Sequence, residues 1–130
     1  MCNTEANQIS VAFNPSNESV NVPIDIQPIV KFNQAMDETT FVYGGNNFTV
    51  ALCEFDNLNV CPPPKVISAS LEIRDSIYSN DTLIIKPDAP LGNGVSYLIY
   101  IGNGIKPDPQ CITYSEPISE KIISKFTTIQ

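Results

Sequence analysis

The strongest constraint on the fold is an alternation of apolar and polar residues in the stretch 20–40. Within it, residues 26–32 place an apolar side chain at every second position, which is the period of a half-buried β-strand. Pro28 removes one backbone donor, so we expect this strand to meet a sheet edge or a bulge there. Residues 37–40, an acidic pair followed by two threonines, then predict a short helical turn.

The same alternation recurs along the chain between clusters of turn-forming residues, and no window keeps apolar residues at helical spacing for three turns. The pattern predicts an all-β fold, an immunoglobulin-like two-sheet β-sandwich of about seven strands. Because 130 residues is the length of one domain, we expect 9–130 to form a single sandwich after a flexible N-terminal segment, 1–8. The expected strands are 9–13, 26–32, 48–53, 67–73, 83–85, 95–101 and 122–128.

The apolar phases of these strands give the expected core. In the strand 48–53, the inward side chains are expected to be Phe48, Val50 and Leu52. The strand 95–101 also has Leu98 and Tyr100 on its other face, so it is either covered on both sides or exposes an apolar strip. The residues expected to be buried together are Ile26, Val30, Phe32, Val50, Leu71, Leu83, Ile85, Tyr97, Ile99 and Phe126.

The composition and the net charge of −7 argue against several classes of function. An acidic surface repels phosphate backbones and anionic lipid, so we expect no nucleic-acid partner. The chain has no histidine, and its carboxylates are typical of solvated turns, so we expect no enzyme activity and no cofactor. No apolar run approaches the roughly 20 residues that cross a bilayer, and we expect neither a membrane span nor a leader.

The four cysteines are Cys2, Cys53, Cys61 and Cys111. They include no CxxC pair, and no histidine is present to complete a zinc site, so disulfides and an oxidising compartment are favoured over metal. Cys2 has a second interpretation, because Cys2 followed by a short polar stretch resembles the mature start of a bacterial lipoprotein. Membrane anchoring is then expected through Cys2 only, and Cys111 would be a free thiol.

Leu91, Gly94 and Tyr97 are spaced as in a tyrosine corner at the beginning of the strand 95–101. In that motif the ring packs in the core and the hydroxyl bonds the backbone a few residues upstream. The alternative interpretation is an ordinary core tyrosine.

Two kinds of residue are candidates for ligand contacts. Tyr43 beside two glycines, and Tyr114 in a long loop, are able to stack on a sugar or anchor a protein partner, although turn tyrosines often have no such role. Loop carboxylates supply the hard oxygen ligands that calcium prefers, but their spacing matches no known calcium loop, and scattered surface acids are the simpler interpretation. The carboxylates concerned are Asp37, Glu38, Asp75, Asp81 and Asp108.

Three stretches, 11–40, 82–107 and 125–128, resemble the bacterial Ig-like domain of the Big_5 type, found in S-layer and other surface proteins. Each motif alone is weak, but together they span nearly the whole chain. The chain departs from the pattern in two ways, by a longer insertion at 106–120 and by four cysteines in a usually cysteine-poor family. The residues that match are Pro15, Val20, Val22, Pro23, Phe32, Asn33, Met36, Asp37, Leu83, Ile85, Pro87, Leu91, Gly94, Tyr97, Phe126 and Thr128.

An Ig-type sandwich implies a disulfide pairing. The chain start and the connection before the last strand lie at one end of such a sandwich, and the connection after the strand 48–53 lies at the other. The expected pairs are therefore Cys53 with Cys61 and Cys2 with Cys111.

The resemblance implies a non-catalytic module of a bacterial surface or secreted protein, acting as a structural spacer or an adhesion unit. The alternative is a carbohydrate- or protein-binding module that uses its loops and is stabilised by calcium. In either case the expected location is extracellular, at the cell surface or periplasmic, and any partner is a protein or a glycan.

Overall fold

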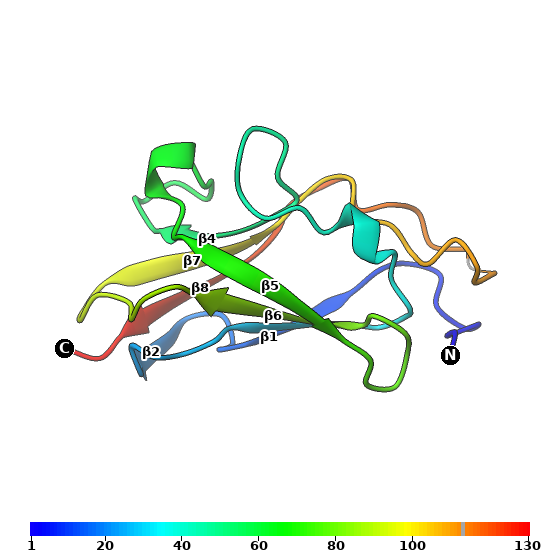
Figure 1. Ribbon diagram of the computed structural model, residues 1–130, viewed down its shortest axis with the longest axis horizontal. Helices are drawn as coiled ribbons and strands as arrows, with labels where there is room; N and C mark the ends of the chain where they lie inside the picture. The colour runs from blue at the N-terminus through cyan, green and yellow to red at the C-terminus, as the bar shows by residue number, and fades with distance from the viewer. Residues whose placement is uncertain (113) are drawn as a thin grey trace.

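The computed structural model describes residues 1–112 and 114–130, and in these residues eight short strands form two four-stranded sheets that pack face to face (Figure 1). One sheet has the order β1-β3-β6-β5 and the other the order β2-β8-β7-β4. The expected all-β sandwich is confirmed, and a helical turn follows β3. The elements are β1 (Val11–Asn14), β2 (Ser19–Val22), β3 (Ile29–Phe32), η1 (Glu38–Thr40), β4 (Val50–Glu54), η2 (Pro63–Lys65), β5 (Ala69–Arg74), β6 (Thr82–Pro87), β7 (Ser96–Ile101) and β8 (Ile122–Thr128).

The strand that the sequence pattern does not predict is β2. It pairs in parallel with β8, where Ser19 lies opposite Phe126 and Val22 opposite Thr128. Of its four residues only Val22 is buried, and Asn21 has a φ of 56° in the left-handed region. Backbone pairing with β8 therefore holds β2 in place. Because β2 has no buried face, its sequence shows no alternation of apolar and polar residues.

The core lies between the two sheets, and eight of the ten residues expected in it are buried. Ile26 and Leu71 are only partly buried and pack against the margin of this cluster. Ile26 precedes β3, which is shorter than expected, and Leu71 lies on the edge strand β5. The buried eight are Val30, Phe32, Val50, Leu83, Ile85, Tyr97, Ile99 and Phe126.

A second apolar cluster covers the outer face of β4 and β7. Ala51 and Leu98 are buried there beneath the segment 55–66, so β7 is covered on both faces. Phe48 packs against this outer cluster, its ring centroid 5.4 Å from that of Tyr100, and the prediction that Phe48 faces the inner core is wrong. The reason is local: the N–H groups of residues 49 and 50 both donate to one carbonyl, that of Val42, which interrupts the alternation just before β4.

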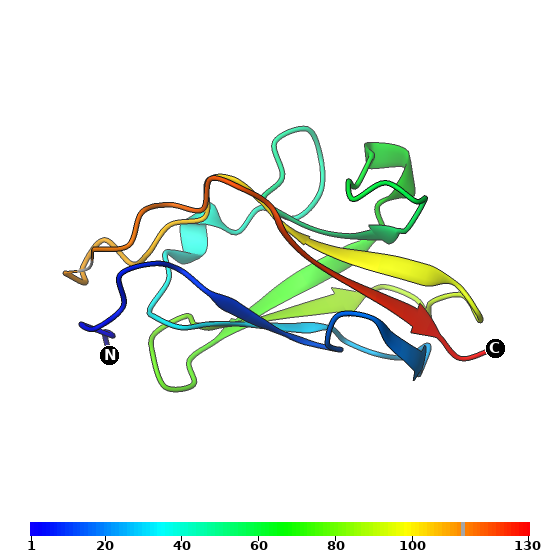
Figure 2. The same ribbon diagram turned by 180° about the vertical axis from the view of Figure 1, so that it is seen from behind.

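The two chain termini lie at opposite ends of the long axis of the sandwich (Figures 1 and 2). The N-terminal end also carries the long connection between β7 and β8, drawn in orange. In the described part of the chain, no helix has the length and apolar character needed to span a membrane.

The segment 1–8, expected to be flexible, is attached to the domain by hydrogen bonds. The amino group of Met1 donates to Ser79 Oγ at 2.7 Å, and Asn3 Nδ2 donates to the carbonyl of Asn33 at 2.6 Å. These bonds bring the first residues against the β5–β6 turn and the end of β3.

Candidate functional site

The connection 102–121 is joined to the N-terminal segment by the disulfide Cys2–Cys111, whose Cα atoms are 5.7 Å apart. The bridge spans 109 positions of sequence, and closing so long a loop stabilises a fold by about 4 to 5 kcal/mol in the chain-entropy model. Gln34 Nε2 also donates to Ser115 Oγ at 2.8 Å, which fixes the connection beyond the bridge. Because Cys2 Sγ is in this disulfide, lipid modification of the same sulfur would require the bridge to be absent.

Two apolar side chains stand out from this end of the molecule. Ile112 is 86% exposed and Tyr114 is 80% exposed, although the connection that carries them is covalently held. Contiguous exposed apolar area marks contact sites for a partner, whereas single exposed apolar side chains are common on protein surfaces. Tyr114 therefore remains a candidate ligand contact.

Tyr43 has a structural position instead. Its half-buried hydroxyl donates to the carbonyl of Ile67 at 2.5 Å and accepts the N–H of Leu52 at 3.2 Å. Burial raises the pKa of Tyr43 to about 12, and the charge of Asp88 adds to this, against the hydrogen bond with Leu52. With its hydroxyl used in this way, Tyr43 joins β4 to the segment before β5.

The second disulfide, Cys53–Cys61, closes the segment 55–66 over β4 and β7, with Cα atoms 5.6 Å apart. Two lysines of the β8 region also hold this segment. Lys121 Nζ donates to the carbonyl of Asn59 at 2.6 Å, and Lys125 Nζ lies 4.4 Å from the centre of the Phe55 ring. The segment is therefore a fixed cover over the sheet.

Tyr97 packs in the core, where its ring stacks on Phe126 with centroids 5.7 Å apart. Its hydroxyl accepts the backbone N–H of Gly92 at 2.7 Å. Gly94 has a φ of 64° and donates its N–H to the carbonyl of Ile129. The glycine that contacts the Tyr97 hydroxyl is thus Gly92, where an added Cβ would lie 3.3 Å from that oxygen. The spacing of Leu91, Gly94 and Tyr97 does not predict this role of Gly92.

Four of the five acidic residues considered as calcium ligands accept hydrogen bonds within their own turns, namely Asp37, Asp75, Asp81 and Asp108. Asp81 is nearly buried and accepts hydrogen bonds from the N–H and hydroxyl of Ser76, the N–H of Tyr78 and the hydroxyl of Thr82. Burial would raise the pKa of Asp81, but these hydrogen bonds outweigh burial and lower it.

The other candidate acids behave in the same way. Asp37 caps η1 through the N–H of Thr39 at 3.0 Å, and Asp108 accepts the N–H of Gln110 at 2.9 Å. Within residues 1–112 and 114–130, no three His, Cys, Asp or Glu side chains come together as a metal site would need. The carboxylates of Asp37, Asp75, Asp81 and Asp108 are therefore hydrogen-bond acceptors that hold turns.

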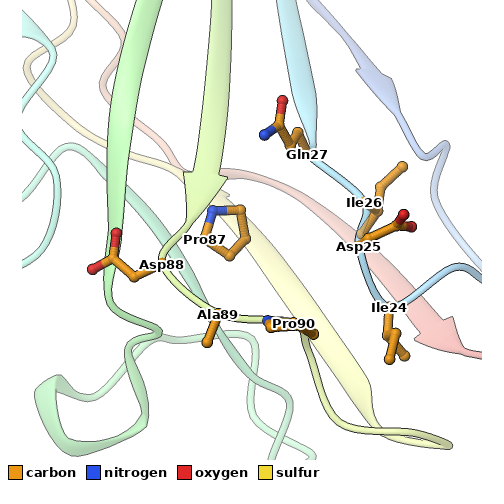
Figure 3. A pocket seen from close by; sticks show the side chains of 8 residues that line it. All are labelled: Ile24, Asp25, Ile26, Gln27, Pro87, Asp88, Ala89 and Pro90. Atoms are coloured by element: carbon orange, nitrogen blue, oxygen red, sulfur yellow. The ribbon is translucent and has the colours of Figure 1, made fainter.

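A shallow hollow of about 210 Å³ lies between the segment 24–27 and the end of β6 (Figure 3). Figure 3 shows Pro87 and Pro90 facing this hollow, with Asp25 and Asp88 on opposite sides of it and their carboxyl groups turned apart. Asp88 also accepts a hydrogen bond from the Ser68 hydroxyl at 2.5 Å. The two carboxylates do not converge on one point, and the hollow is open rather than enclosed.

The loop side chains described above bond mainly backbone groups, and the hollow beside β6 is shallow. A family model described as the bacterial Ig-like domain, Big_5, matches residues 4–128. The chain belongs to this family. No curated protein matches the chain. Big_5 domains are generally non-catalytic, and the two disulfides of this Ig-like domain fit a compartment outside the cytoplasm.

Proposed function

We propose that this Ig-like domain is a non-catalytic module of a bacterial surface or secreted protein and acts as a structural spacer or an adhesion unit. The observation that carries the proposal is the placement of the chain termini at opposite ends of the long axis (Figure 1). A module built in this way adds its full length between whatever precedes and whatever follows it. The two disulfides support the same role, because they brace both ends of the sandwich.

Cell fractionation with thiol trapping tests the location. The native protein is expected in the surface or secreted fraction, with all four cysteines protected from an alkylating reagent until a reductant is added. Recovery from the cytoplasm with reactive thiols would overturn the proposal. Turnover of a substrate, lost on mutating a loop carboxylate, would overturn its non-catalytic part.

The same preparation tests membrane attachment through Cys2. A lipidated Cys2 cannot bond to Cys111, so a lipoprotein would show an acylated N-terminal peptide together with one reactive thiol. Peptide mapping that recovers a Cys2–Cys111 peptide instead would rule out this form of anchoring.

The second candidate function is recognition of a glycan or protein by the loops, and the exposure of Ile112 and Tyr114 favours it. Glycan and protein arrays with the wild type and Tyr114→Ala test it. Loss of a specific signal in the variant is the expected result, and an unchanged signal would assign the contact to another surface. Tyr43→Ala is unsuitable here, because its hydroxyl bonds the backbone inside the domain.

A further inference from the structure

The outer face of the sheet β1-β3-β6-β5 brings together side chains that are far apart in the sequence. The register places Ala12, Lys31, Thr82 and Arg74 in one row across the four strands. The opposite phase of these strands, with Val30 among others, is buried in the core, so this row faces away from the core. Ala12, Lys31 and Arg74 are exposed in it, and Thr82 is covered by its neighbours. The next outward row is Asn14, Ile29, Ile84 and Glu72, and Lys86 lies opposite Ser70 beyond it.

This face, called here the basic face and defined by Lys31, Arg74, Lys86 and Glu72, has a charge balance opposite to that of the whole chain. The four strands contain three of the seven basic residues and one of the fourteen acidic ones, and the exposed Asp88 continues the outward phase of β6 at the border of the face. Asp88 lies just beyond the end of β6 and accepts a hydrogen bond from Ser68. The rest of the surface is therefore strongly acidic, and the basic face is a local exception.

Glu72 lies between two of the cations. Its carboxylate accepts a hydrogen bond from Lys86 Nζ at 3.1 Å and pairs with Arg74 Nε through its other oxygen. The hydrogen bonds from Lys86 and then from Arg74 lower the pKa of Glu72. The Arg74 side chain is still 63% exposed and that of Lys86 40% exposed, so both keep donors open to a ligand.

Lys31 borders two shallow hollows on the same sheet. One, of about 200 Å³, extends from Ala12 and Lys31 toward Ser10 and Asn33, and the other, of about 190 Å³, extends from the same pair toward Asn14. The small side chain of Ala12 leaves this space beside the ammonium group. Lys31 and Arg74 are separated by β6, which sets their backbones roughly 10 Å apart, at two strand spacings.

We propose that the basic face binds an anionic polysaccharide, whose carboxylate or phosphate groups pair with Lys31, Arg74 and Lys86. The polymer would lie across the strands, with its hydroxyl groups against the polar side chains of Asn14 and Ser70. The proposal gives the adhesion role proposed above a partner, and it rests on that role.

Charge density and shape favour this partner over other anions. Duplex DNA carries one charge about every 1.7 Å, which a few separated cations do not match. Single-stranded nucleic acid binds by stacking its bases on aromatic side chains, and the outward positions of the four strands hold none. A large acidic protein would meet the repelling remainder of the surface. A thin, sparsely charged polymer touches the basic face alone.

The test uses polygalacturonate as the probe and neutral dextran as its control. Binding of polygalacturonate, weakened by salt and absent for dextran, is the expected result. The variant Lys31→Gln with Arg74→Gln should lose affinity by about tenfold or more, which corresponds to about 1.4 kcal/mol. Lys65→Gln with Lys106→Gln removes the same charge from other exposed positions and should change the affinity little.

Glu72→Gln provides the sharper comparison, because it removes the carboxylate that competes for Lys86 and Arg74. Its affinity should rise, whereas Glu54→Gln, the same change at an exposed position of β4, should have a much smaller effect. Equal effects of these two variants, or stronger binding of DNA or anionic vesicles than of polygalacturonate, would overturn the proposal. The altered side chains are exposed, or partly exposed for Glu72, and a thermal midpoint near that of the wild type confirms that each variant is folded. If polygalacturonate does not bind, the basic-face proposal is wrong, but the proposed function is still tested independently by cell fractionation.

Discussion

The hydroxyl of Tyr97 holds a backbone group that no strand partner satisfies, the N–H of Gly92. Tyr97→Phe leaves this donor unpaired in a partly buried position, which costs about 1 to 3 kcal/mol. We expect the free energy of unfolding, measured with urea, to fall by that amount. Tyr114→Phe removes a hydroxyl from an exposed ring and is the matched control. Equal losses in the two variants would show that the bond to Gly92 contributes nothing of its own.

Tyr43 predicts a pH dependence at the alkaline end. Its pKa is raised to about 12 in the folded domain, above the ordinary value of 10.0, so the folded state holds the phenolic proton more tightly than the unfolded chain. The resulting stabilisation is complete below pH 10 and is lost as the pH rises toward 12. Ultraviolet titration should show a phenol that ionises near pH 12, and Tyr43→Phe should remove this component. A titration curve that Tyr43→Phe leaves unchanged at its alkaline end would contradict this assignment.

At the scale of elements, the alternation of apolar and polar residues identifies a strand when one of its faces is buried and the other is exposed to solvent. In β3, Val30 and Phe32 are buried while Lys31 is exposed, and this strand is predicted correctly from its sequence. The same rule fails for β2, which the β8 backbone holds, and for Phe48, which lies beyond the irregularity at residues 49 and 50. The alternation of apolar and polar residues shows which face of a strand is covered. A strand that is held only by backbone pairing and has no covered face lacks this alternation.

The Cys53–Cys61 bridge is expected to hold the segment 55–66 against the outer cluster. Replacing both cysteines by alanine should cost about 2 to 3 kcal/mol in the chain-entropy model for a short loop. Hydrogen exchange should rise mainly in the segment 55–66, since the inner core between the sheets is not touched. The matched control replaces Cys2 and Cys111 by alanine, which should leave exchange in this segment unchanged. Faster exchange throughout the sheet in the Cys53–Cys61 variant would mean that the segment is not an independent cover.

At the scale of the whole molecule, the candidate surfaces were less predictable than the fold. The glycines after Tyr43 suggest an exposed turn, but the chain folds back there through the bond from the Gly44 N–H to the Val50 carbonyl, and the Tyr43 side chain is half-buried. The basic face leaves no signal in the sequence, because Lys31, Arg74 and Lys86 belong to three different strands. Only the pairing register brings them onto one surface.

The Cys2–Cys111 bridge has a mechanical consequence, because the termini lie at opposite ends of the sandwich. A force applied at Met1 and Gln130 passes through the bridge into residues 111–130, so residues 3–110 lie inside a covalent ring that the force cannot open. At about 3.5 Å per extended residue, the stretched length should be roughly 80 Å with the bridge intact and roughly 450 Å after reduction.

Force spectroscopy in oxidising and reducing buffer measures both lengths. The variant with Cys2→Ala and Cys111→Ala should reach the length of the reduced protein in reducing buffer, and in oxidising buffer it should fall short only by the small loop that Cys53–Cys61 closes. Full extension of the oxidised wild type would show that the bridge does not carry the tension. With the bridge closed, most of the domain cannot be drawn out by tension, and the length it can reach is set by the oxidation state of a single pair of sulfur atoms.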